Sequence, residues 1–128
     1  MDLSTPTVPI SVGELFDKFS ILEIKKEKIK DQQKLKHVNN EIFLLKKLTS
    51  KYNLDPKLYD KLKKVNLSLW EVEDKLRIKE KNKEFDNIFI DLARCVYFTN
   101  DRRAEIKKEI NKKMGSFIFE IKDYCKYK

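Results

Sequence analysis

Six apolar residues recur between positions 58 and 76 at spacings of four and three, without a break. They are Leu58, Leu62, Val65, Leu69, Val72 and Leu76. This a/d repeat places all six on one face of a helix, and the helix must bury that face against other helices. Only 2 glycines and 3 prolines occur in 128 residues, too few for the turns of an all-β sandwich or barrel. The repeat therefore predicts an all-α fold.

Three more helices are expected from apolar spacing and from residues that start or stop helices. Ser11 and Glu14 form a capping box, and Pro56 suits the first position of a helix. The polar run 79–84 is predicted to be a loop. Three of the expected helices have an N-terminal capping residue: Ser11 for 11–30, Asp31 for 32–52, and Asp55 for the third helix. The fourth, 85–114, is expected to end at Gly115.

Short connections between four helices predict a single domain, an antiparallel four-helix bundle over residues 11–115. Residues 1–10 contain two prolines and no helical period, so an extended segment is expected there. Residues 116–128 are rich in apolar and aromatic side chains, which predicts a packed C-terminal tail of either strand-like or helical spacing. Ile21 and Ile24 make the first helix apolar on a second face. That helix is therefore central or lies at an interface, and the two apolar faces predict a homodimer.

The charge pattern limits the classes of partner. The 29 basic and 21 acidic residues give a net charge of +8, but the basic residues are mostly lysines scattered over every expected helix. Specific nucleic-acid binding requires a concentrated basic stripe and is not expected. No apolar run is long enough for a membrane span, and the first residues lack the features of a signal peptide. A cytoplasmic protein is the resulting expectation.

The cysteine and histidine residues do not form the pattern of a metal or cofactor site. Cys95 and Cys125 lie far apart without a CxxC motif, and His37 is the single histidine. A zinc site needs several such ligands at short spacings, so no metal site, no disulfide and no cofactor are expected.

Polar residues interrupt the apolar pattern in two places. Beside the 58–76 repeat, one helical face carries Asn66, Trp70, Glu73 and Arg77. In the last expected helix, Arg103 takes a core-type position, with Asn100 close by. An isolated buried charge costs several kcal/mol, so Arg103 requires a carboxylate partner, with Glu73 the first choice and Asp17 the second.

Two interpretations of these residues stay open. The cluster is either an internal ion-pair network that fixes the helix register, or a pocket for an anion or a sugar-like molecule, with Trp70 as platform and Arg103 as anchor. The candidate ligand-binding residues are Asp17, Trp70, Glu73, Arg77, Asn100 and Arg103.

An enzyme is the competing hypothesis, although no glycine-rich phosphate loop and no nucleophile–base pair is recognisable. Glu14 with Asp17, and Glu71 with Asp74, resemble the ExxD spacing with which all-helical nucleotide pyrophosphatases hold Mg²⁺. Carboxylates three residues apart share a helix face and can ligate a hard cation. The alternative function is thus a metal-dependent enzyme acting on a nucleotide or nucleotide sugar.

Three segments carry a resemblance to a known family. VGELFDKFSILEIK at 12–25, LWEVED at 69–74 and ARCVYFTNDRRA at 93–104 resemble a small family of uncharacterised helical proteins from bacteria and phages. The family has no established activity, and the occurrence of some relatives near surface-polysaccharide genes points to sugar chemistry. The resemblance implies that the following match its motif positions: Asp17, Lys18, Ser20, Glu23, Trp70, Glu73, Asp74, Arg94, Asn100, Asp101, Arg102 and Arg103.

Taken together, the sequence favours a non-enzymatic accessory or binding protein with a polar Arg/Glu/Trp site inside a helical bundle. The expected partner is an anionic or sugar-like ligand or another protein.

Overall fold

The computed structural model describes residues 4–127, and over that range the chain is all-α, as predicted. Its helices are α1 (Val12–Lys28), α2 (Gln32–Thr49), α3 (Pro56–Lys81) and α4 (Asn87–Met114). They form a helical bundle, and no strand occurs among the described residues. Within the same part of the chain, no helix has the length and apolar content needed to cross a lipid bilayer.

The helix boundaries follow the caps, with corrections at several ends. Ser11, Asp31 and Asp55 cap α1, α2 and α3 as expected, and Gly115 ends α4 in the left-handed conformation at φ 63°. The cap of α4 is Asp86, so this helix starts two residues later than expected. The helices α1 and α2 end at residues 28 and 49, short of the expected 30 and 52.

The predicted loop 79–84 is wrong in its first half, because α3 continues to Lys81. Lys79 lies in the last turn of α3 and reaches forward to Glu84 and Asp86, at 2.9 Å from each. These ion pairs tie the end of α3 to the start of α4, and only residues 82–86 connect the two helices. Polarity alone does not predict this helix end, because Lys79 is a polar residue that still lies within α3.

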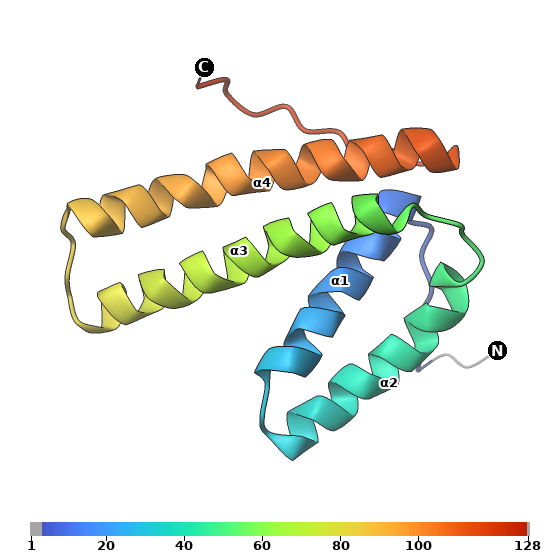
Figure 1. Ribbon diagram of the computed structural model, residues 1–128, viewed down its shortest axis with the longest axis horizontal. Helices are drawn as coiled ribbons and strands as arrows, with labels where there is room; N and C mark the ends of the chain where they lie inside the picture. Colours follow the sequence, from blue (N-terminus) through green and yellow to red (C-terminus); the bar gives the residue numbers. More distant parts are fainter. Residues whose placement is uncertain (1–3, 128) are drawn as a thin grey trace.

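Two helical hairpins make up the bundle (Figure 1). The helices α3 and α4 lie side by side and run in opposite directions, and α1 and α2 form a shorter pair that leaves them at an angle. The first helix packs against all three others, whereas α2 packs only against α1 among the described helices. The bundle is therefore less regular than the expected four-helix arrangement. Its central element is α1.

The core lies where α1 meets the α3–α4 pair. Val12 and Phe16 of α1 pack there against Leu58 and Leu62 of α3 and Ile110 of α4. Farther along the a/d repeat of α3, Val72 and Leu76 are only half-buried, where α4 alone runs beside α3 in Figure 1.

The central position of α1 also accounts for its two apolar faces. Ile24 on the second face and Leu22 on the main face are both buried within the chain. Of the two residues of the second face, Ile24 is thus covered within the chain, whereas Ile21 is only half-buried, and the expected homodimer stays a prediction.

Within the described residues, the segments before α1 and after α4 are non-helical. Residues 6–10 carry no regular secondary structure, in keeping with the extended segment expected for 1–10, of which 1–3 lie outside the described residues. The tail 117–127 is neither strand nor helix and runs back along α4 (Figure 1). Phe117 and Ile121 are exposed, so the tail contacts the body mainly through Glu120 and Tyr127 rather than by apolar burial.

Three backbone N–H groups at the start of α1 find side-chain partners, and two of these partners fasten this helix end to α4 and the residue just beyond it. The Ser11 hydroxyl accepts from the N–H of Glu14 at 3.0 Å, and Asn111 Oδ1 of α4 accepts from the N–H of Gly13 at 2.6 Å. Ser116, just beyond α4, accepts from the N–H of Val12 at 3.2 Å. Donors that a helix start leaves unpaired are thus used to hold two helices together.

Gly13 is required for this close approach. A Cβ atom at this position would lie 2.6 Å from the main-chain oxygen of Lys107, so α1 and α4 would have to move apart. We expect Gly13→Ala to lower the free energy of unfolding by about 1–3 kcal/mol. Urea denaturation measures the change, with Lys26→Ala on the exposed side of α1 as the control within about 0.5 kcal/mol of the parent. Parental stability of the Gly13 variant would contradict the tight contact.

Candidate functional site

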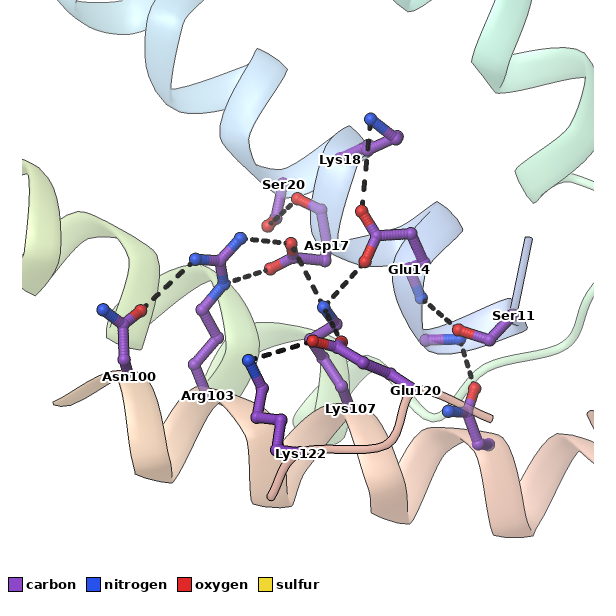
Figure 2. Close-up of polar contacts among 12 residues, drawn as sticks. Ser11, Glu14, Asp17, Lys18, Ser20, Asn100, Arg103, Lys107, Glu120 and Lys122 are labelled. Atoms are coloured by element: carbon purple, nitrogen blue, oxygen red, sulfur yellow. Dashed lines mark hydrogen bonds and ion pairs between the residues drawn. The ribbon is translucent and has the colours of Figure 1, made fainter. Parts of the chain in front are cut away.

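A carboxylate lies at the centre of the polar cluster, where α1 crosses α4 (Figure 2). The Asp17 side chain on α1 is 1% exposed, and Arg103 of α4 binds it with two hydrogen bonds. Arg103 Nε lies 2.9 Å from Asp17 Oδ1, and Nη2 lies 2.5 Å from Oδ2. This two-point pairing gives the guanidinium a fixed orientation as well as a counter-charge.

The helix α3 contributes to the same cluster through Asn66. Its side-chain Nδ2 donates to Asp17 Oδ1 at 3.0 Å and to the Ser20 hydroxyl oxygen at 2.8 Å. The Ser20 hydroxyl in turn donates to the main-chain oxygen of Asp17 at 2.8 Å. The Asp17 carboxylate of α1 is thus held by side chains of α3 and α4, and all buried side-chain polar atoms in the described residues have a partner.

The first-choice partner for Arg103 is corrected by this geometry. Asp17, the second choice, forms the pair, whereas Glu73 is exposed on α3 and lies 4.0 Å from Arg77 of the same helix. The Asp17 carboxylate is close enough to pair with Arg103 because α1 crosses α4 near Arg103. Sequence spacing could not reveal that crossing, since α1 is far from α4 along the chain.

The Arg103 guanidinium has one bound edge and one accessible edge. Its hydrogen bonds to Asp17 raise the pKa of Arg103, against the opposing effect of burial. The side chain is still 28% exposed, and its Nη1 lies 3.4 Å from Asn100 Oδ1 (Figure 2). Donor capacity therefore remains on the edge that faces away from Asp17.

Arg103 and Asn100 line a groove of about 530 Å³ between α3 and α4, and Ile21 of α1 also lines it. Five of the six predicted ligand-binding residues line it, and Asp17 lies beneath Arg103 as its counter-charge. The five are Trp70, Glu73, Arg77, Asn100 and Arg103. The structure also adds Asp74, Asn66 and Leu69 to the lining, so two acidic and two basic side chains face the groove.

A second basic residue of the cluster, Lys107, was missed from the sequence. Its side chain is only 9% exposed, and its Nζ donates to Glu14 at 2.7 Å and to Glu120 at 2.8 Å. Burial alone would lower the pKa of Lys107, but these hydrogen bonds and the nearby Asp17 raise it. Lys107 follows Arg103 by one helical turn. In so lysine-rich a chain that spacing gave no usable signal.

The acids of the ExxD hypothesis do not come together. Glu14 and Asp17 are engaged by Lys107 and Arg103, whereas Glu71 and Asp74 lie exposed on α3. No group of three or more potential metal ligands gathers among residues 4–127. The cysteines at 95 and 125 are free and exposed, and the histidine at 37 is exposed.

Comparison with protein-family models finds a match over residues 6–127, and the chain belongs to this family, the family of unknown function DUF6165. The sequence-based recognition of an uncharacterised family is therefore confirmed. Searches against curated proteins and against solved structures return no significant match.

Removal of Arg103 is expected to destabilise the fold strongly. Arg103→Ala would leave the buried Asp17 without its two-point partner, at a cost of about 3–5 kcal/mol in the free energy of unfolding. Arg77→Ala is the matched control, since Arg77 is 81% exposed and its ion pair with Glu73 is long, and it should change stability by less than about 1 kcal/mol. Chemical denaturation of the two variants compares them directly. Equal stabilities would mean that the pair does not hold α1.

A double variant, Asp17→Leu with Arg103→Met, should cost less than Arg103→Ala alone. It removes both charges together and leaves no uncompensated carboxylate in the core. The same denaturation experiment tests the order, and a double variant less stable than the single one would contradict it.

The tail contact should depend on acid pH. Hydrogen bonds from Lys107 and Lys122 lower the pKa of Glu120 from 4.5 to about 2. The contact therefore stabilises the fold fully above about pH 4.5, and this contribution is lost as the pH falls toward about 2. We expect the stability difference between the parent and Glu120→Gln to shrink over that interval in thermal unfolding. A difference that stays constant down to about pH 3 would argue against the ion pair.

Proposed function

We propose that this member of the family is a binding protein whose groove between α3 and α4 receives a small, polar, sugar-like ligand. The supporting observation is the convergence of Trp70, Asn100 and Arg103 on one groove above a buried ion pair. Small-molecule sites typically combine an apolar surface with a few fixed polar groups. Here Trp70 supplies the surface and Arg103, oriented by Asp17, supplies fixed donors.

The charge of the groove favours a neutral polyhydroxylated ring over a simple anion at this position. Asp17 already offsets the charge of Arg103, and Glu73 and Asp74 outweigh Arg77 along the lining, so there is no net attraction for an anion. Carboxylate, amide and guanidinium groups together offer both donors and acceptors, which a row of hydroxyl groups can satisfy. The apolar face of a sugar ring would lie on Trp70, as aromatic platforms combine an apolar body with a defined geometry.

The Asp17–Arg103 pair stabilises the fold, and the groove beside it is still free to bind a ligand. Trp70 is half-buried, and Arg77 is far more exposed than a residue that serves packing. Neither is needed to satisfy the buried charge of Asp17, which already has Arg103 and Asn66. The polar groups around the groove thus exceed what the fold requires.

Trp70 is the single tryptophan of the chain and serves as an intrinsic probe. We expect a sugar or nucleotide sugar that binds the groove to change the Trp70 emission and to raise the melting temperature. Arg77→Ala should weaken binding roughly tenfold, the equivalent of one charge-assisted hydrogen bond. The panel contains neutral sugars, sugar phosphates, nucleotides and nucleotide sugars.

Arg94→Ala is the matched control, because Arg94 is an exposed arginine of α4 outside the groove. The double variant Asp17→Leu with Arg103→Met should fold and lose the ligand if Arg103 anchors it. A variant that folds and still binds would restrict the pair to a structural role. A panel without any change in Trp70 emission would overturn the proposal.

A further inference from the structure

A second hollow adjoins the groove on the other side of Arg103. It has a volume of about 230 Å³, and Asn100 and Arg103 line both spaces. Its remaining walls come from Lys107 on α4, Glu14 on α1, and Glu120 and Lys122 on the tail. One ligand could therefore extend from Trp70, past Arg103, into this hollow.

The Glu120 carboxylate is held there as an external anion would be. Lys107 Nζ lies 2.8 Å from one carboxylate oxygen of Glu120, and Lys122 Nζ lies 2.9 Å from the other (Figure 2). Lys107 is nine-tenths buried, so it is a fixed part of the wall rather than a mobile surface lysine. With Glu120 withdrawn, Lys107 Nζ would keep Glu14 at 2.7 Å as its close carboxylate, with Asp17 3.9 Å away, and would regain a free donor for an external anion.

The rest of the tail is attached only lightly to the body. Phe117 is 97% exposed and Ile121 is 85% exposed, and a further hollow of about 380 Å³ lies between the tail and α4. Besides Glu120, the tail is held near its end by Tyr127, which contacts Tyr97 and donates to Asp101. Apart from the ion pair of Glu120 with Lys107, few apolar contacts have to be broken to move this segment away from the body.

We propose that the second hollow is an anion subsite for a carboxylate or phosphate group, and that Glu120 occupies it as an internal stand-in that the ligand displaces. The assignment of this anionic group to the same ligand as the Trp70 groove rests on the proposed function. The subsite itself does not. The groove takes the neutral part of the ligand, and the subsite takes the charged part and frees the tail.

Inorganic phosphate at constant ionic strength is the probe. Glu120 competes with it as a tethered group, so Glu120→Gln should bind phosphate roughly tenfold more tightly than the parent in calorimetric titration. Glu109→Gln is the matched control, an exposed acid of α4 that pairs with Lys113 away from the hollow, and it should match the parent. Acetate in place of phosphate separates a carboxylate ligand from a phosphate ligand.

Limited trypsin digestion follows the tail itself, through cleavage after Lys122. Phosphate should accelerate this cleavage severalfold in the parent, whereas Glu120→Gln should be cleaved rapidly with or without phosphate. The subsite is overturned if Glu120→Gln binds neither anion more tightly than the parent, or if its tail is cleaved no faster.

Trp70→Ala keeps the two proposals apart. The phosphate response should persist in this variant, because Trp70 does not line the second hollow. If the parent protein binds phosphate but no sugar, the proposed function of the groove is wrong and the anion subsite is still supported.

Discussion

The burial of Asp17 is the constraint on which the rest of the structure depends. A carboxylate that is almost fully excluded from water costs several kcal/mol unless its oxygens are bonded, and this cost requires Arg103 and Asn66 to lie where they do. Because the two partners belong to α4 and α3, the requirement fixes the crossing of α1 over both helices. Apolar packing of Val12 and Phe16 supplies attraction at this crossing, but hydrophobic contact is non-directional and does not set the register.

The fold class and the composition of the groove could be predicted from local patterns, and the tertiary partners could not. The a/d repeat, the aspartate caps and the stripe that holds Trp70 and Arg77 are each contained within one helix. The pairing of Arg103 with Asp17 depends on where α1 crosses α4, and no spacing within a helix encodes that position. Lys107 shows the same limit. Its importance comes from burial, which composition conceals in a chain with so many lysines.

The unequal packing of the two hairpins explains where the groove lies. The α1–α2 hairpin leaves the α3–α4 pair at an angle (Figure 1), and the groove lies between α3 and α4 with Ile21 of α1 among its lining residues. A regular four-helix bundle would cover this surface with the last turns of a neighbouring helix. The polar stripe of α3 beside its apolar repeat is consistent with that exposure, since Trp70 and Glu73 meet solvent rather than a fourth helix.

Arg103 links stability to binding because its guanidinium is planar and has two usable edges. Asp17 holds Nε and Nη2, and this bond satisfies the buried carboxylate, while Nη1 remains beside Asn100 at the junction of the two hollows. A lysine could supply the charge to Asp17 but not a second, fixed edge. The orientation that a ligand would meet is therefore determined by the fold before any ligand arrives, which reduces the ordering cost of binding.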